Sequence, residues 1–294
     1  MSSFKEVRML TQQQLLALHY LFPISAKVVT QLTEISPTSL RKSLPISAKK
    51  AQQIFHNYEK IQHYDFLSYY AQQHITPIMY TDNAYPTMLL NSYDAPSLLY
   101  AKGNINLLQQ MAIAIIGSRK AGLYTKVVLE AIIPPLIKAN TVIVSGLAKG
   151  ADTYAHEHTI ACGGQTIAVL GHGFYHMYPR ENELLAEKIA TEHLLLTEFA
   201  PHMPPARHHF PMRNRIISGL SQALVVTEAA MRSGTLITTE FALEEGKDVF
   251  VVPGPIHSPL SQGTNYLLQE GAIPIINGNQ IIDAMQLIFL NHGK

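Results

Sequence analysis

The architecture of this chain can be predicted from one segment, Met111-Ala-Ile-Ala-Ile-Ile-Gly-Ser-Arg-Lys-Ala-Gly122. It begins with a short, continuous apolar run that ends at a glycine, a pattern typical of a strand buried on both faces. A helical pattern follows from Leu123 to about Ile133, where Pro134-Pro135 should kink or end the helix. The segment therefore predicts a strand followed directly by a helix, the repeating unit of a parallel α/β sheet.

The loop that leaves this predicted strand, Gly117-Ser118-Arg119, has the features of an anion site. Because a helix is expected to begin just after it, the loop presents unpaired backbone N–H groups at a helix N-terminus. Arg119 adds a planar guanidinium whose geometry suits phosphate. An ordinary strand–helix turn with a solvated Arg119 explains the same residues, so the choice depends on the rest of the chain.

Composition and charge bound the classes to which this protein can belong. The 294 residues suffice for one large domain and a small one, and 47% of them are hydrophobic, which allows a sizeable core. The formal net charge of +1 says nothing about partners, so affinity for an anionic polymer must come from local clusters of cations. The single cysteine, Cys162, excludes an intrachain disulfide and a thiolate metal site, and we expect it to be a small buried residue on a helix.

The sequence gives no sign of a targeting or membrane segment. The N-terminus, Met-Ser-Ser-Phe-Lys-Glu-Val-Arg, lacks an apolar h-region, and no run approaches the ~18 apolar residues of a membrane span. We therefore expect a soluble cytoplasmic protein with no membrane partner, and we predict no metal site and no cofactor.

The chain divides into a helical part and an alternating part. Residues 1–75 have apolar positions near helical spacing, residues 76–103 are rich in turn signals, and buried strands alternate with helices from 111 to about 285. This pattern predicts an α/β fold with a doubly wound, mostly parallel sheet in residues 76–294, preceded by a small all-helical domain in residues 1–75. Strands are expected at 112–116, 141–144, 166–170, 194–197, 223–227, 249–252 and 273–276, and helices at 123–133, 150–162, 181–191, 213–220 and 235–246.

Ligands bind such sheets at the carboxyl ends of the strands, so the residues that follow each strand are the candidates for function. Most of these loops combine Gly or Ser with Arg or Lys, and together they would form a rim of N–H donors and cations suited to several phosphates. The candidate phosphate-binding residues are Gly117, Ser118, Arg119, Ser145, Gly146, Lys149, Gly171, Gly173, Arg180, Arg207, Arg213, Arg215, Ser233, Gly234 and Thr235.

One of these loops also carries an aromatic residue among its arginines. Residues 199–227 contain no acidic side chain, and they place Phe210 between Arg207 and Arg213. This combination suits a single-stranded nucleic acid, because cations follow its backbone while a π-face supports a base. Core packing explains Phe210 equally well, and we expect His156 to be a hydrogen-bonded structural residue.

Three enzyme signatures are incomplete in this sequence. Gly171-His-Gly-Phe-Tyr-His176 lacks the third glycine of the dinucleotide fingerprint, and no Gly-Lys-Ser/Thr occurs at the spacing of a Walker loop. Ser145-Gly146 and Ser233-Gly234 lack the flanking glycines of a nucleophile elbow, so no Ser/His/Asp set can be argued. Glu228 and Glu240 are candidate acids, but one sequence cannot pair them in space. We therefore expect a protein without catalytic residues.

Several short motifs occur in one order along the chain. They are Ile116-Gly-Ser-Arg119, Ser145-Gly-Leu-Ala-Lys-Gly-Ala-Asp152, Thr166-Ile-Ala-Val-Leu-Gly-His-Gly173, Tyr178-Pro179, Phe210-Pro-Met-Arg-Asn-Arg-Ile-Ile217, Ser233-Gly-Thr-Leu-Ile-Thr238 and Val252-Pro-Gly254. Together they resemble the DNA-processing protein A family (DprA, also called Smf). The resemblance covers roughly residues 76–285, and so many ordered motifs make it specific.

The resemblance implies an extended Rossmann fold that dimerises and has no established catalytic activity. Members of this family bind single-stranded DNA in natural transformation (competence), protect the incoming DNA and help load the RecA recombinase on it. The family's phosphate and base contacts correspond here to Gly117, Ser118, Arg119, Arg180, Arg207 and the segment from Phe210 to Arg215, which includes Asn214.

An alternative function is a nucleotide-processing hydrolase on a similar Rossmann core. Gly234-Thr235 followed by Glu240 resembles the Gly-Thr-x-x-Glu signature of nucleoside-monophosphate phosphoribohydrolases. In this chain four residues, not two, separate the threonine from the glutamate, and the preceding Gly-Gly is missing. Release of the base from nucleoside monophosphates would distinguish the hydrolase from a DNA-binding protein.

Two further predictions concern assembly. We expect a homodimer, because the apolar tail formed by Ile281-Ile282 and Leu287-Ile-Phe-Leu290 needs a partner surface, either in its own core or on a second chain. We also expect residues 1–75 to be a separable module, because helical periodicity gives way to a turn-rich sequence near Thr76.

Overall fold

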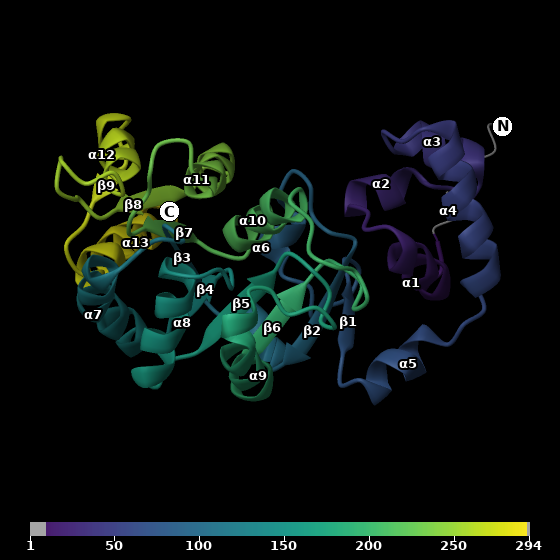
Figure 1. The fold of residues 1–294 in the computed structure, drawn as a ribbon, viewed down its shortest axis with the longest axis horizontal. Helices are drawn as coiled ribbons and strands as arrows, with labels where there is room; N and C mark the ends of the chain where they lie inside the picture. Colours follow the sequence, from purple (N-terminus) through teal and green to yellow (C-terminus); the bar gives the residue numbers. More distant parts are fainter. Residues whose placement is uncertain (1–9, 293–294) are drawn as a thin grey trace.

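A mixed β-sheet forms the centre of the molecule (Figure 1). The computed structural model describes residues 10–292, with side chains described up to residue 285. Within these residues the strands are β1 (Thr76–Met79), β2 (Leu98–Gly103), β3 (Ala112–Ile116), β4 (Val142–Ser145), β5 (Thr166–Leu170), β6 (Leu194–Thr197), β7 (Ala223–Val226), β8 (Asp248–Val251) and β9 (Ile273–Pro274). Their order across the sheet is β1-β2-β6-β5-β4-β3-β7-β8-β9.

The seven strands from β6 to β9 in this order are parallel, and β1 and β2 form an antiparallel edge. The chain winds outward from β3 through β4 and β5 to β6, then returns to the other side of β3 and continues through β7 to β9. This confirms the predicted doubly wound α/β fold. The point where the winding reverses lies between β3 and β7, and ligand crevices form at such a point.

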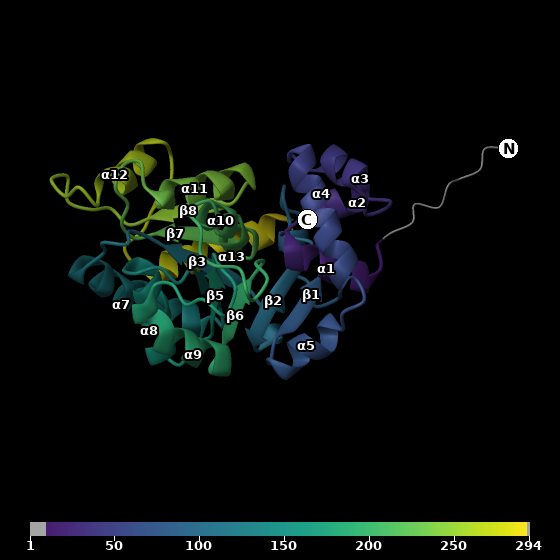
Figure 2. The ribbon, with the colours of Figure 1, turned by 45° about the vertical axis from the view of Figure 1, so that its right-hand side comes forward.

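Helices cover both faces of the sheet (Figures 1 and 2). One face carries α7 (Leu123–Lys138), α8 (Ala151–Ala161), α9 (Glu183–Glu192) and α13 (Gly278–His292). The other carries α6 (Thr87–Leu90), α10 (His209–Gly219), α11 (Gly234–Glu244) and α12 (Gln262–Gln269). Two short 3₁₀ helices, η1 (Ile105–Gln109) and η2 (Arg180–Asn182), precede β3 and α9.

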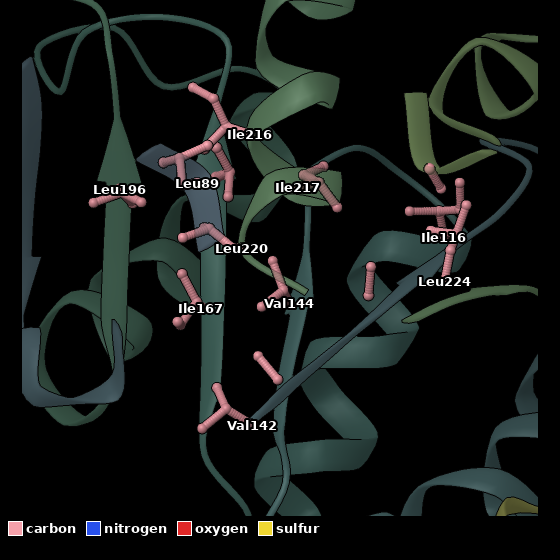
Figure 3. Close-up of a cluster of buried hydrophobic side chains, with 14 of the residues drawn as sticks. Leu89, Ile116, Val142, Val144, Ile167, Leu196, Ile216, Ile217, Leu220 and Leu224 are labelled. Atoms are coloured by element: carbon pink, nitrogen blue, oxygen red, sulfur yellow. The ribbon is translucent and has the colours of Figure 1, made fainter. Parts of the chain in front are cut away.

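The alternation of side chains along β3 shows why the sheet is buried on both sides. Ala114 and Ile116 belong to the cluster that packs under α10, whereas Ile113 and Ile115 belong to the cluster under α7. Figure 3 shows the first cluster, in which Leu89, Ile216, Ile217 and Leu220 lie over Ile116, Val142, Val144, Ile167, Leu196 and Leu224 of the strands. Each such aliphatic side chain stabilises the fold by about 1.5–3 kcal/mol when fully buried.

The sequence predicts that Pro134-Pro135 kink or end the helix that begins at Leu123, and the predicted end near residue 133 is wrong. The helix α7 contains Pro134 and Pro135 and continues to Lys138. The two prolines remove backbone donors from the helix, but Ile133 and Leu136 on either side of them are fully buried in the core. Packing against the sheet and α13 therefore holds the last turn in place, which local propensity alone does not predict.

From residue 10 onward, five helices precede the sheet, namely α1 (Gln12–Leu21), α2 (Ala26–Gln31), α3 (Pro37–Ser43), α4 (Ala48–Ile61) and α5 (Phe66–Gln72). Thr11 caps α1 in a capping box with Gln14. The core of these helices also includes Met79, Leu98 and Tyr100 of the β1–β2 edge. The independence of residues 1–75 therefore stays a prediction, because the two parts share apolar surface.

Three smaller expectations concern the cysteine, membrane segments and metal sites. Cys162 caps the end of α8 and is exposed, so the prediction of a buried cysteine is wrong. Among residues 10–292, none of the helices has the length and apolar character needed to cross a membrane. The described side chains also contain no group of three or more His, Cys, Asp or Glu that could hold a metal ion.

Candidate nucleic-acid interface

A cleft of about 80 Å³ opens at the carboxyl ends of β4 and β5, beside the loop that leaves β3. Its walls come from that loop, from the loops after β4 and β5, and from the first turns of α10. Its polar and aromatic lining consists of Arg119, Lys149, His172, Tyr178, Phe210 and Arg213. Arg119, Lys149, Phe210 and Arg213 are residues that the sequence predicted for the site, so the fold brings these four together.

Arg119 and Phe210 form the mouth of the cleft. The Cζ atom of Arg119 lies 5.2 Å from the centre of the Phe210 ring, which is the geometry of a cation–π contact. Arg119 is exposed and Phe210 is half-buried, and the ring of Tyr178 lies 5.8 Å from that of Phe210. The mouth thus offers a cation to a phosphate and aromatic faces to a base at the same place.

The Gly117-Ser118 turn is built to bring Arg119 to this mouth. A side chain on Gly117 would overlap Thr227 and Ala151, so only glycine fits between β7 and α8 here. The Gly117 carbonyl accepts a hydrogen bond from Oγ1 of Thr235 at 3.1 Å. The hydroxyl of Ser118 accepts from the Lys120 amide at 3.0 Å. Gly117, Ser118 and Thr235 therefore hold the shape of the turn.

Arg213 forms the floor of the cleft rather than its rim. Its side chain is buried, with Nη1 3.5 Å from Oδ2 of Asp152 and 3.4 Å from the Val169 carbonyl. Burial lowers the pKa of Arg213 and raises the pKa of Asp152, and each residue's charge opposes the shift of the other. Gly146 is required beside this pair, because a Cβ there would overlap the Arg213 guanidinium.

Arg215 points away from the cleft, although it follows Arg213 by only two residues. Its guanidinium donates to the Glu198 carboxylate, and its Nε lies 3.4 Å from Oδ2 of Asp94. Burial raises the pKa of Glu198, and the charge of Arg215 opposes that shift. Arg215 thus joins the end of β6 to the segment before β2, and its guanidinium does not line the cleft.

Four other predicted residues make contacts that hold the loops of the site in place. The Ser145 hydroxyl is fully buried and donates to the Ile115 carbonyl at 2.6 Å. The Gly173 amide donates to the Met203 carbonyl at 2.8 Å, and a side chain at this glycine would overlap Ala200. Asn214 donates to the Gly234 carbonyl at 3.4 Å and so joins α10 to the start of α11. Gly171 lies under the Phe210 ring.

Four accessible cations, called the rim here, line the cleft or lie close to its lining in sequence: Arg119 and Lys149 line it, Arg180 follows the lining residue Pro179, and Arg207 precedes Phe210 by three residues. Within the described residues, no carboxylate lies within 4 Å of Arg119, Arg180 or Arg207, and all three are exposed. Lys149 is also exposed but pairs with Glu181. The rim therefore presents three unpaired guanidinium groups and one ammonium that a phosphate would take from a carboxylate.

The loop after β7 lies on the other side of the Gly117 turn. Ser233 precedes the first residue of α11 but makes no capping hydrogen bond, and its hydroxyl has no partner among the described atoms. The preceding Arg232 is exposed and has a φ of +58°, a conformation that non-glycine residues seldom adopt. Gly234 is exposed at the start of α11.

Sequence reasoning missed two residues that line the cleft. The buried His172 ring lies 3.0 Å from the Gly173 carbonyl and 3.2 Å from the Tyr178 carbonyl, so it fixes the loop after β5. Burial lowers the pKa of His172. In the sequence, Tyr178 was noted only as part of the Tyr178-Pro179 motif. Its aromatic side chain close to Arg180 could have indicated a role in the site.

Residues 76–286 match the family model of DNA recombination-mediator protein A. The chain belongs to this family. It is 47% identical over 201 residues to the DNA processing protein DprA of Streptococcus pneumoniae, which covers 68% of this chain and 71% of that protein. It is 42% identical over 220 residues to DprA of Bacillus subtilis, which covers 74% of each chain.

Two solved structures of DNA processing protein A resemble this fold. The Streptococcus pneumoniae protein matches with a TM-score of 0.77 and 39% identity, over 95% of this chain and 94% of its own. The Helicobacter pylori protein matches with a TM-score of 0.65 and 30% identity, over 72% of this chain and 95% of its own. The Helicobacter pylori structure concerns the single-stranded DNA binding mode of that protein. The predicted family and its Rossmann-like fold are thus confirmed.

Proposed function

We propose that this chain binds single-stranded DNA through the cleft and the exposed arginines at its rim. The observation that carries the proposal is the contact between Arg119 and Phe210, with 5.2 Å between Cζ and the ring centre. A phosphate paired with the guanidinium leaves the neighbouring base beside the aromatic ring. Arg180 and Arg207, which are exposed and unpaired among the described residues, extend the cationic rim along the backbone of the strand.

The two segments that flank Phe210 and Tyr178 lack acidic residues, and the acids nearest the cleft, Asp152 and Glu181, are paired with Arg213 and Lys149. Residues 171–180 and 199–227 form much of the surface near Phe210, and neither segment contains Asp or Glu. The family membership of the chain and the single-stranded DNA binding of the Helicobacter pylori relative point in the same direction. A duplex would fit less well, because its stacked bases cannot reach the face of the Phe210 ring.

The test compares single- and double-stranded oligonucleotides of one sequence in a mobility-shift titration at fixed salt. We expect a clear preference for the single strand, and Phe210→Ala should weaken its binding by about 1–3 kcal/mol. The matched control is Tyr93→Ala, because Tyr93 is an 86% exposed aromatic residue outside the cleft. Equal affinity for both forms of DNA, or an unchanged affinity of the Phe210 variant, would contradict the proposal.

The finer role follows from the family resemblance. We propose that the protein acts in natural transformation, where it protects incoming single strands and helps load the RecA recombinase on them.

We also propose a homodimer. Ile281 and Met285 of α13 pack in the chain's own core against α7, and the side chains of Leu287–Leu290 lie outside the described part. Light scattering at about tens of micromolar tests the dimer, and a monomer mass would overturn it.

We propose that binding occurs without catalysis. The candidate acid Glu228 is buried and accepts a hydrogen bond from Oγ1 of Thr125 at 2.7 Å, and Glu240 is exposed on α11. The hydroxyl of Thr235 is engaged by the Gly117 carbonyl, so the Gly234-Thr235 motif serves the turn. Incubation with nucleoside monophosphates tests this point, since release of the free base would support the hydrolase instead.

A further inference from the structure

A cluster of tyrosines lies where the N-terminal helices meet the loop after β5. Tyr64 comes from the segment before α5, the half-buried Tyr69 comes from α5 itself, and Tyr175 comes from the loop. We propose that these three residues, called here the tyrosine platform, stack bases of single-stranded DNA that leaves the cleft. The inference rests on the proposed function, because it extends the path of the same strand.

The platform joins two parts of the chain that are far apart in sequence. The hydroxyl oxygens of Tyr69 and Tyr175 lie 2.7 Å apart and share a hydrogen bond. The rings of Tyr64 and Tyr69 meet edge to face with 5.8 Å between their centres. Tyr64 is 50% exposed and Tyr175 is 45% exposed, so each presents a large part of its ring to solvent. The cluster therefore offers aromatic surface both from the N-terminal helices and from the loop after β5.

Buried neighbours hold these rings in place. The Phe66 ring is buried and lies 5.0 Å from the centres of both the Tyr64 and the Tyr20 rings. Tyr20 in turn lies 4.2 Å from the His202 ring. On the opposite side the Tyr175 amide donates to the Pro201 carbonyl at 2.9 Å. A base that stacks on such fixed rings loses little free energy in ordering them.

The same loop connects the platform to the cleft. Tyr178 lines the cleft, and Tyr175 precedes it by three residues, so their Cα atoms can lie at most about 11 Å apart. Within that interval His176 donates its amide to Gly173 and places its ring 2.9 Å from the His202 carbonyl. A strand that leaves Phe210 past Tyr178 thus reaches Tyr175 within a few nucleotides.

On the side of Tyr175 the charge of this surface suits a polyanion. Residues 171–180, which carry Tyr175, contain no acidic side chain. Lys102 lies 5.3 Å from the Phe174 ring, next to Tyr175, and supplies a cation on that side. On the side of Tyr64 the nearest acid in sequence is Asp65, whose exposed carboxylate caps α5 and keeps its negative charge, because its hydrogen bonds to Ser68 lower its pKa. Every base has a π-face, so tyrosines in this setting bind nucleic acid without regard to sequence.

The experiment compares two lengths of oligothymidylate in fluorescence-anisotropy titrations. Oligonucleotides of about 4 and about 16 nucleotides span the range of site sizes seen in single-strand binding folds. We expect Tyr175→Ala to weaken binding of the long strand about five- to 150-fold and to leave the short strand unchanged. Tyr175→Phe should bind both lengths like the wild type, because it keeps the ring. Tyr93→Ala is the matched control for loss of an exposed tyrosine.

The outcomes distinguish base stacking on the Tyr175 ring from a structural role of Tyr175 and from binding of a protein partner. Long-strand affinity that does not change in a folded Tyr175→Ala variant overturns the platform and leaves this surface to a protein partner. An equal loss in Tyr175→Phe also overturns stacking, because only the bond to Tyr69 is then missing. Photo-crosslinking of a long strand with 5-iododeoxyuridine should yield peptides that contain Tyr64 or Tyr175. If the short strand does not bind the wild type, the proposed function itself fails, which is a separate result.

Discussion

Replacing Arg119 by alanine removes one unpaired cation from the mouth of the cleft. The expected change in DNA affinity and in its salt dependence follows from the number of unpaired arginines at the rim. Three exposed arginines, Arg119, Arg180 and Arg207, are without a carboxylate partner among the described residues. If each neutralises one phosphate, log K should fall with log salt at a slope of about −2 for single strands. The slope of the variant should be about −1.4, because each phosphate contact contributes roughly 0.7.

The affinity itself should fall roughly ten- to 100-fold, since a hydrogen bond to a charged group contributes about 1.5–3 kcal/mol. The loss should be the same for every sequence, because phosphate contacts carry no base information. The fold should remain intact, because Arg119 is exposed and forms no ion pair among the described residues. Lys149 steepens both slopes equally if DNA displaces it from Glu181.

The assay is a salt titration of oligonucleotide binding with the wild type, Arg119→Ala and a matched control, Lys138→Ala. Lys138 is exposed at the C-terminal end of α7, which lies at the edge of the sheet opposite to the cleft. The control should keep the slope of the wild type. If folded Arg119→Ala has the same affinity and slope as the wild type, Arg119 is a solvated residue in an ordinary turn and the reasoning fails.

Three further predictions concern stability and domain structure. Gly146→Ala should destabilise the fold by about 3 kcal/mol or more in urea unfolding, because its Cβ separates the buried Arg213–Asp152 pair; an unchanged midpoint would contradict this. Burial lowers the pKa of His156 to about 4, so the unfolded chain binds the proton first and stability is lost as the pH falls from 6.5 toward 4. The loss amounts to about 3 kcal/mol, and His156→Gln should show a shallower decline over that pH range in thermal melts. A chain that begins near residue 74 should stay soluble and bind DNA, whereas its aggregation would show that the β1–β2 edge needs the N-terminal helices.

The central strands β3 to β7 were predictable because each is a short apolar run with both faces buried. The predicted strands 112–116, 166–170 and 194–197 match β3, β5 and β6 in both bounds. The helices were less certain where proline intervenes. Helix α10 begins at His209 rather than at residue 213, because Pro211 lies in its first turn, where a missing N–H costs little.

The site was predictable as a set of loops, but the direction of each side chain was not. Arg213 and Arg215 stand two residues apart on α10, and an α-helix rotates by about 200° over that interval. One guanidinium therefore enters the floor of the cleft, while the other reaches Asp94 and Glu198. Both arginines belong to the same sequence motif, and only the positions of their carboxylate partners in the fold determine where each guanidinium points.

The difference between the buried and the exposed arginines limits which groups are available to bind a DNA strand. Arg213 and Arg215 already satisfy buried carboxylates, and to remove either one from its partner costs about 3–5 kcal/mol. The free energy of binding must therefore come from the exposed groups, which are the rim arginines and the aromatic faces of Phe210 and Tyr178. Those groups recognise features that every single strand shares. Binding through them should thus be independent of sequence, sensitive to salt, and possible without rearrangement of the buried frame.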